Sequence, residues 1–192
     1  DRGAQLALIS GAKTKIGYKS NSKFDKVFDI YLPKQEFRHT LEMDLDTLKA
    51  LELKTFEKKV EIFWSEKDEE KVEEILSKNN LENQDFIHIH PVSRWLFKCI
   101  NDKTMASIID FCELELNKKV ILTAAPIKEE MDKLNSIMNL CKSKPLNFGG
   151  LFTLKQTACL NKKAKAFIGV DTSIMHISAA NDIPVLAFFG PS

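Results

Sequence analysis

The sequence predicts an α/β protein built on a parallel, doubly wound sheet, and two observations support this fold class. Apolar runs such as 166–168 and 185–189 are continuous, as in strands buried on both faces, instead of alternating with polar residues. Between such runs, apolar residues recur at steps of three and four, as they do along helices. Strands that alternate with helices in this way favour right-handed crossovers between parallel neighbours.

The composition is that of an ordinary globular protein and gives no whole-chain argument for a nucleic-acid partner. The 192 residues are 44% hydrophobic and 29% charged, with 28 basic and 27 acidic side chains and a net charge of +1. The four cysteines are far apart and form no CxxC pair, which disfavours a zinc site or a redox motif and favours reduced thiols. No apolar run approaches the roughly 20 residues that span a bilayer. The first residues read like the middle of a helix, so we expect a piece of a longer protein.

Residues 1–64 predict a partial N-terminal domain. Its pattern mixes charge, aromatic residues and proline, and the periodic segments are short. The expected elements are a helix ending near Gly11, short strands at 15–18 and 27–31, a helix beginning at Thr40, and a strand at 60–64.

Residues 65–192 predict a second domain in which strands and helices alternate regularly. Ser65 with Asp68, and Thr153 with Gln156, fit the capping pattern that opens a helix. The expected strands are 86–90, 119–123, 146–148, 166–168 and 185–189. The expected helices begin at Ser65, are capped by Asp102, run from Ile127, are capped by Thr153, and follow the polar turn 171–173.

Polar residues follow two of the predicted strands where those strands end. The turn 171–173 (Asp-Thr-Ser) opens a helix, whose first N–H groups suit an anion. The loop after strand 86–90 is longer than the roughly two to six residues usual in such connections, and it carries Ser93, Arg94 and Lys98. The carboxyl ends of parallel strands meet at one sheet edge, so these groups predict a clamp for a diphosphate.

Each of these residues also has a structural interpretation. Asp171 suits a helix N-cap at least as well as a binding role. Most arginine and lysine side chains are solvated surface cations, and this is the simpler interpretation of Arg94 and Lys98. Their position in one loop at the sheet edge nevertheless favours a role in binding an anion. A single helical histidine such as His176 is more often structural than catalytic, and the apolar stretch 95–97 is expected to pack the loop.

Two further pairs lie near the same edge. His88 and His90 share one strand face, but no third metal ligand accompanies them, so we assign them to packing and hydrogen bonding. Glu129 and Glu130 follow strand 119–123, and either could accept from ribose hydroxyls, although exposed acids at a helix start are the simpler interpretation. The chain contains no GxGxxG, P-loop or GxSxG pattern.

Two stretches carry a family resemblance. The stretch FIGVDTSIMHISAANDIPVLAFFGPS, residues 167–192, resembles the signature of glycosyltransferase family 9, the bacterial heptosyltransferases. The loop HPVSRWLFKC, residues 90–99, looks like the matching segment and is most similar to the heptosyltransferase III branch of that family. The resemblance is strong after Asp85 and weak before Trp64.

The resemblance implies a GT-B architecture of two Rossmann-like domains, with the nucleotide sugar held mainly by the C-terminal one. It implies transfer of heptose from ADP-heptose to the inner core of lipopolysaccharide, with inversion and without a metal or other cofactor. It also implies a cytoplasmic protein, with peripheral contact to the inner membrane as a further expectation. The general base of the family is expected upstream of Asp1, so we expect the present chain to bind donor and to transfer nothing.

The resemblance also assigns roles to individual residues. Lys98 would assist the leaving diphosphate, and Asp171 and His176 would contact the heptose or its phosphate; these three are the expected catalytic group. The expected donor-binding residues are Ser93 and Arg94 at the phosphates, Thr172 and Ser173 at the diphosphate, Glu129 (or Glu130) at the ribose, and Phe152 (or Leu151) at the adenine. Ser173 stands where many members of the family have glycine.

Two alternative functions remain open on the sequence. One is another GT-B enzyme, an epimerase or a transferase with a different donor, which screening of nucleotide sugars would separate. The other is a non-catalytic nucleotide-binding module, which would tolerate Asp171→Ala and His176→Ala. The sequence names neither the acceptor sugar nor the oligomeric state.

Overall fold

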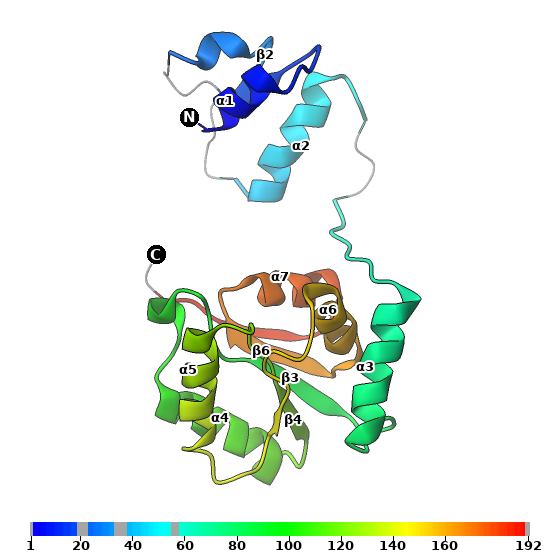
Figure 1. Ribbon diagram of the computed structural model, residues 1–192, viewed down its shortest axis with the longest axis vertical. Helices are drawn as coiled ribbons and strands as arrows, with labels where there is room; N and C mark the ends of the chain where they lie inside the picture. The colour runs from blue at the N-terminus through cyan, green and yellow to red at the C-terminus, as the bar shows by residue number, and fades with distance from the viewer. Residues whose placement is uncertain (1, 19–22, 33–37, 55–57, 191–192) are drawn as a thin grey trace. The chain divides into compact units, whose positions relative to one another are not determined.

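The computed structural model describes residues 2–18, 23–32, 38–54 and 58–190, and the chain divides into two compact units. These are Asp1–Lys59 and Val60–Ser192 (Figure 1). The division falls slightly before the expected boundary after Trp64. Ile62 and Trp64 pack against apolar clusters of the second unit, which explains why the linking stretch belongs to it.

The first unit is small and mixed in structure. It consists of α1 (Arg2–Ile9), β1 (Ile16–Tyr18), a 3-10 turn η1 (Asp25–Val27), β2 (Ile30–Leu32) and α2 (Thr40–Ala50). The strands β1 and β2 form a two-stranded parallel pair. The second expected strand begins later than 27–31, because residues 25–27 form the 3-10 turn.

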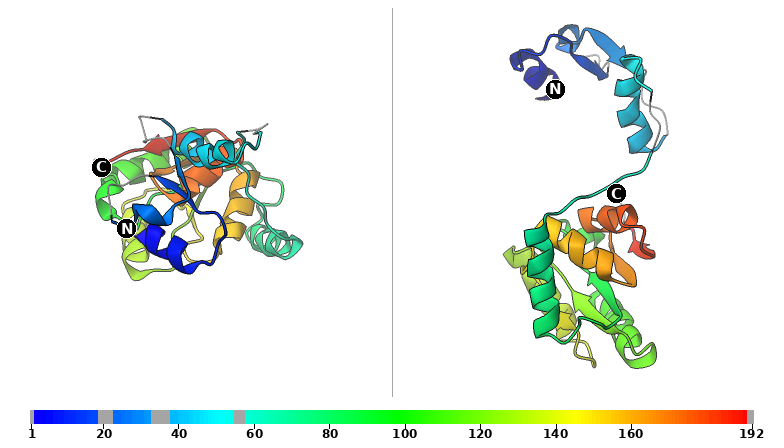
Figure 2. Two further views of the ribbon diagram at one scale, coloured as in Figure 1. Left: turned by 90° about the horizontal axis from the view of Figure 1, so that it is seen from above. Right: turned by 90° about the vertical axis from the view of Figure 1, so that its right-hand side faces the viewer.

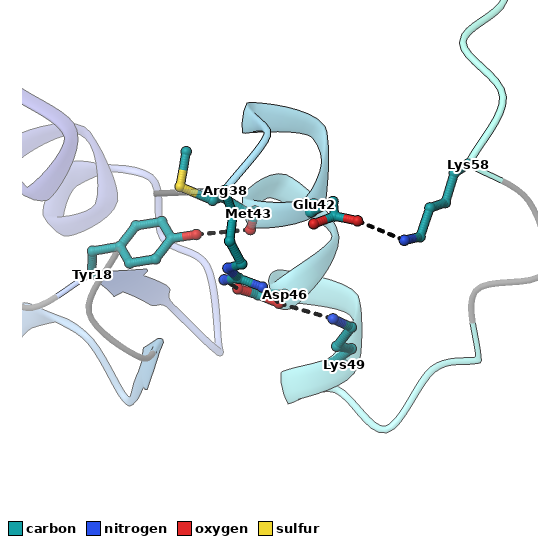
Figure 3. Close-up of polar contacts among 7 residues, drawn as sticks. All are labelled: Tyr18, Arg38, Glu42, Met43, Asp46, Lys49 and Lys58. Carbon is teal, nitrogen blue, oxygen red and sulfur yellow. Dashed lines mark hydrogen bonds and ion pairs between the residues drawn. The ribbon is translucent and has the colours of Figure 1, made fainter. Parts of the chain in front are cut away.

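A buried carboxylate organises α2 (Figure 3). Asp46 is only 6% exposed, and its carboxylate accepts hydrogen bonds from Arg38 and from Lys49, the latter at 3.1 Å. The hydrogen bond from Arg38, followed by that from Lys49, lowers the pKa of Asp46. Tyr18 Oη donates to the Met43 carbonyl at 2.7 Å, which ties α2 to β1. Polar contacts therefore hold much of this unit together.

The second unit contains a five-stranded parallel sheet in the order β5-β4-β3-β6-β7. The strands are β3 (Phe86–His90), β4 (Lys119–Leu122), β5 (Leu146–Asn147), β6 (Ala166–Val170) and β7 (Val185–Phe188). The helices are α3 (Glu66–Lys78), α4 (Asp102–Asp110), α5 (Lys128–Met138), α6 (Leu154–Lys163) and α7 (Ser173–Ala180), with short turns η2 (Leu96–Lys98) and η3 (Phe111–Glu115). The predicted α/β fold with a parallel sheet is confirmed.

Helices cover both faces of this sheet (Figures 1 and 2). On one face, Ile87 and Ile89 of β3 pack in a buried cluster with residues of α4 and α5. On the other face, Phe86 of β3 and Phe167 of β6 pack against α3, α6 and α7. Strand side chains alternate between faces, so His88 and His90 lie on the side of α6 and α7.

The strand order places a crevice beside β3. The chain leaves β3 toward β4 and β5 on one side, then crosses to β6 and β7 on the other. Ligands of doubly wound sheets bind outside the carboxyl ends of the strands where the winding reverses. A ligand site is therefore expected among the loops that follow β3, β4 and β6.

Two sequence-based expectations about elements were wrong. Residues 60–64 form no strand, because none of the described strands pairs with them, and Ile62 and Trp64 pack individually on the second unit. The N-cap of α4 is Asn101, whose side chain accepts from the Lys103 N–H at 2.9 Å. Asp102 lies inside the first turn instead, where it accepts from Ser136 Oγ at 2.8 Å.

Among the described residues, no helix has the length and apolar character that a membrane crossing requires.

Candidate functional site

A pocket of about 370 Å³ opens at the carboxyl edge of the sheet, where β3, β4 and β6 end. Its size is at the lower end of the range of ligand pockets, roughly 300–1,000 Å³. Its lining includes most of the residues expected at a donor site, namely Ser93, Arg94, Phe152, Asp171, Thr172 and Ser173. The structure therefore brings these residues together at one sheet edge, while their binding roles stay predictions.

The loop after β3 forms one wall. Ser93 is buried, and its Oγ accepts from the Trp95 N–H at 3.2 Å, which stabilises the turn. The guanidinium of the exposed Arg94 lies 5.8 Å from the centre of the Trp95 ring. We expected residues 95–97 to pack the loop, but Trp95, Leu96 and Phe97 are 57%, 47% and 59% exposed. The 3-10 turn η2 directs these side chains outward, and Trp95 lines the pocket.

The start of α7 forms the opposite wall. Its N-cap is Thr172, whose side chain makes no capping hydrogen bond. Thr172 Oγ1 is enclosed and has no hydrogen-bond partner in the described part of the chain. Asp171 precedes the cap, so the N-cap interpretation of its carboxylate is wrong. The first N–H groups of α7, beside the exposed Ser173, are consequently available to an anion.

An ion pair connects the two walls. Lys98 Nζ donates to Asp171 Oδ2 at 2.5 Å, and the two side chains are 27% and 30% exposed. Gly190, after β7, supports this arrangement, because a Cβ there would come within 3.0 Å of the Phe97 carbonyl oxygen and 3.1 Å of Lys98 Cα. Lys98 is not itself among the residues that line the pocket, but it pairs with Asp171, which is.

Of the two candidates for the ribose contact and the two for the adenine contact, only one each lines the pocket. Glu130 lines the pocket and is 5% exposed, and its Oε2 accepts from the Ala125 N–H at 2.9 Å. Glu129, the residue we favoured for ribose, is exposed and lies outside the lining. Adjacent helix positions face different directions, so only one of the two can face the pocket. Likewise Phe152 lines it, whereas Leu151 is exposed elsewhere.

His176 lies apart from the pocket lining. It is exposed on α7, and within the described part of the chain its side chain makes no hydrogen bond or ion pair. The structure therefore does not bring this residue together with Lys98 and the rest of the expected catalytic group at the pocket. Across the described ranges, no group of three or more His, Cys, Asp or Glu side chains is placed to hold a metal ion.

Sequence reasoning missed the floor of the pocket. His90 and Thr123 line it, and His90 Nδ1 lies 2.9 Å from Thr123 Oγ1. His88 Nε2 contacts the same hydroxyl at 2.7 Å, so both histidines take part in the hydrogen bonding expected of them. The missed signal was the row of polar residues on one face of otherwise apolar strands.

Comparisons with known proteins identify relatives of the whole chain. The model of glycosyltransferase family 9 (heptosyltransferase) matches residues 2–192. Lipopolysaccharide heptosyltransferase 3 of Escherichia coli is 32% identical over 108 residues, which cover 56% of this chain and 32% of the relative. The match to that enzyme of strain K12 is 27% identical over 153 residues, covering 79% of this chain and 44% of the relative. The chain therefore spans less than half the length of these curated relatives.

Solved structures share the fold. A glycosyl transferase family 9 protein from Veillonella parvula superposes with a TM-score of 0.84 at 20% identity, covering 96% of this chain and 53% of that one. The E. coli ADP-heptose LPS heptosyltransferase II superposes with a TM-score of 0.70 at 18% identity, covering 98% of this chain and 60% of that one. At these identities the likeness establishes the GT-B fold, and roles of individual residues need separate arguments.

Proposed function

The chain belongs to glycosyltransferase family 9, the heptosyltransferases, and from this premise we propose that its second unit holds the ADP-heptose donor of a lipopolysaccharide heptosyltransferase. One observation carries the proposal. The Lys98 loop and the uncapped start of α7 open on the same pocket, one supplying cations and the other free N–H groups. Both are groups that bind phosphate.

The diphosphate would lie between these two walls. Lys98 would leave Asp171 and turn toward a phosphate oxygen, with Arg94 and the Ser93 hydroxyl beside it. The Thr172 hydroxyl, enclosed and without a partner among the described residues, would donate to another oxygen, as would the first amides of α7. The bound diphosphate would thus complete hydrogen bonds that the free protein leaves unmade.

The same groups account for catalysis. In an inverting transfer, an acceptor hydroxyl gives its proton to a general base and attacks the anomeric carbon, the bond to the diphosphate oxygen breaks, and ADP leaves with the electron pair. Cations and oriented amides stabilise the charge that develops on the departing oxygen. Lys98 is therefore the group on which we expect departure to depend most, without a metal ion in the reaction.

Other residues would contact the ribose, the adenine and the heptose of the donor. Glu130 uses one carboxylate oxygen to accept from the Ala125 N–H, and within the described residues this leaves Oε1 to accept from a ribose hydroxyl; this assignment replaces our preference for Glu129. Phe152 would pack against the adenine. Once Lys98 moves to the diphosphate, the Asp171 carboxylate becomes free for heptose hydroxyls. His176, exposed on α7, is proposed to contact the heptose side from outside the pocket.

The acceptor side rests on the relatives. Curated relatives are named lipopolysaccharide heptosyltransferases, so we propose the inner core of lipopolysaccharide as acceptor. The first unit is the proposed acceptor side, working at the cytoplasmic face of the inner membrane through peripheral contact.

Calorimetric titration with ADP tests the donor site on the chain itself. We expect binding to the wild type and affinity reduced by about tenfold or more in Lys98→Ala, because a hydrogen bond to a charged group contributes about 1.5–3 kcal/mol. Lys103→Ala on α4 removes an exposed lysine away from the pocket and is the matched control. Absence of ADP binding, or equal affinities for all three proteins, would refute the proposal.

A further inference from the structure

A buried row of polar side chains runs from α7 to the pocket, and its far end is fixed by backbone carbonyls. Ser178 Oγ donates to the Ile174 carbonyl at 2.8 Å, so its oxygen can only accept from Asn161 Nδ2, also at 2.8 Å. Asn181 Nδ2 donates to the Ala158 carbonyl and to Asn161 Oδ1, both at 2.9 Å. Both ends of the Asn161 amide are therefore assigned.

This amide determines where the first histidine carries its proton. Asn161 Nδ2 is a donor and lies 3.0 Å from His88 Nδ1, which must accept. Burial lowers the pKa of His88 to about 3, so the ring is neutral and its single proton is on Nε2. His88 Nε2 then donates to Thr123 Oγ1 at 2.7 Å.

The Thr123 hydroxyl in turn determines which nitrogen of His90 carries the proton. Burial lowers the pKa of His90 to about 4, so this ring is also neutral. If His90 Nδ1 carried the proton, Thr123 Oγ1 would receive two donors and its own hydrogen would have no described acceptor in a side chain that is only 3% exposed. That arrangement leaves a buried donor unsatisfied, which is costly. Thr123 therefore donates to His90 Nδ1, and the proton of His90 is on Nε2.

His90 lies at the pocket, and among the described residues its Nε2–H is left available to a ligand. His90 is 7% exposed and lines the pocket, and its Nε2 has no partner within the described residues. In the sheet register His90 pairs with Gly169, which places it between the start of the Ser93 loop and the turn at Asp171.

We propose that His90 is a neutral hydrogen-bond donor to the nucleotide, presenting Nε2–H to a diphosphate oxygen. The hydrogen bonds that link Asn161, His88 and Thr123 position this donor, because they determine the tautomer of His90. The proposal rests on the donor site proposed above, and it adds a contact that depends on the pocket floor instead of the two walls.

Nitrogen-15 NMR of the histidine rings tests the tautomer without any ligand. We expect His90 to show a protonated Nε2 and an unprotonated Nδ1 at every pH from 6 to 8, with Thr123→Val producing a mixture of tautomers. Addition of ADP should move the His90 Nε2–H signal. A protonated Nδ1, an imidazolium at pH 7, or a signal that stays unchanged at saturating ADP would each overturn the proposal.

Variants of His90 test the contact by calorimetry with ADP. His90→Gln keeps a neutral amide donor near the position of Nε2 and should bind within about threefold of wild type, whereas His90→Phe, which has no donor, should bind about tenfold more weakly. Thr123→Val keeps the imidazole and should weaken binding by a few fold, which provides a second readout if His90→Phe does not fold. Equal affinity of folded His90→Phe and wild type overturns the proposal.

The two proposals fail in different ways. If Lys98→Ala weakens ADP binding while the His90 and Thr123 variants do not, the donor site stands and the role of His90 is wrong. If the wild type binds no ADP, the donor site itself is wrong, and the diphosphate contact of His90 is lost with it.

Discussion

Lys98 and Asp171 come from loops that are distant in sequence, yet they form an ion pair at the pocket edge. In the free protein each neutralises the other, so the diphosphate must compete with Asp171 for Lys98. A partly exposed pair of this kind contributes about 0.2–1 kcal/mol. The pair is therefore weak enough for a nucleotide to displace it.

This competition predicts opposite effects of one substitution on binding and on turnover. Asp171→Asn releases Lys98, so we expect ADP to bind up to about fivefold more tightly in calorimetry. In a full-length heptosyltransferase that contains this chain, heptose transfer should fall when Asp171 is changed to Asn, because the carboxylate proposed for the heptose is lost. Weaker ADP binding by Asp171→Asn would contradict the exchange of partners.

The two neighbouring glutamates provide a matched pair. Glu130→Gln should weaken ADP binding by about tenfold while its effect on inorganic diphosphate binding stays small, because the carboxylate addresses the ribose. Glu129→Gln changes an exposed side chain outside the pocket and should leave both affinities unchanged. Competition titrations with the two ligands distinguish these results, and equal effects of the two substitutions would remove Glu130 from the site.

At the scale of residues, sequence reasoning predicted which loops supply the site but not how side chains are oriented within it. Asp171, Thr172 and Ser173 lie where the parallel-sheet argument placed them. Adjacent residues such as Glu129 and Glu130 differ only in the direction they face, which depends on the exact start of α5. The hydrogen-bond chain through His88 and His90 depends on contacts between distant elements, which no local pattern contains.

At the scale of elements, the N-terminal caps of the helices show which features a short stretch of sequence can predict. Ser65 with Asp68 and Thr153 with Gln156 form complete capping boxes, as their spacing predicted. The start of α7 differs, because Thr172 caps nothing with its side chain. The sequence alone does not separate a threonine that caps from one that remains available to a ligand.

This difference predicts unequal effects on stability. Thr153→Ala should lower the free energy of unfolding by about 1 kcal/mol, because the bond from the Gln156 N–H to Thr153 Oγ1 is lost. Thr172→Ala removes no capping bond and should change stability by less than about 0.5 kcal/mol, while weakening ADP binding. Urea unfolding of the two variants measures the difference, and an equal loss in both would show that Thr172 also caps.

Other elements required information beyond periodicity. The stretch 60–64 has apolar residues suitable for a strand, but a strand also needs a neighbour, and no strand in the described ranges pairs with it. After Asp110 the helical pattern continues through Cys112, and the structure changes there to a π-helical turn, Phe111–Glu115. Both cases depend on tertiary contacts that override local preference.

At the scale of the whole molecule, the buried histidines predict how stability of the second unit depends on pH. The unfolded chain takes up a proton at each histidine near pH 6.5, whereas burial lowers the pKa values of His88 and His90 to about 3 and about 4. The unfolded state therefore binds more protons below pH 6.5, and stability falls as the pH falls. Each histidine should remove about 2 kcal/mol between pH 7 and pH 5.

Urea unfolding followed at pH 7, 6 and 5 measures this dependence. His88→Gln should roughly halve the loss, because one of the two protonation differences is removed. His39→Gln, in the first unit, should leave the dependence of the second unit unchanged. A wild type whose stability is constant from pH 7 to pH 5 would show that the histidines are not buried as neutral rings.

The central claim is that the pocket beyond β3, β4 and β6 holds the diphosphate of a nucleotide-sugar donor. A crystal structure of the chain with ADP tests it most directly. We predict a diphosphate within hydrogen-bond distance of Lys98 Nζ, the first amides of α7 and His90 Nε2, with Asp171 released from Lys98 and the adenine against Phe152. ADP bound elsewhere, or bound there with the Lys98–Asp171 pair intact and no contact to α7, would contradict the account.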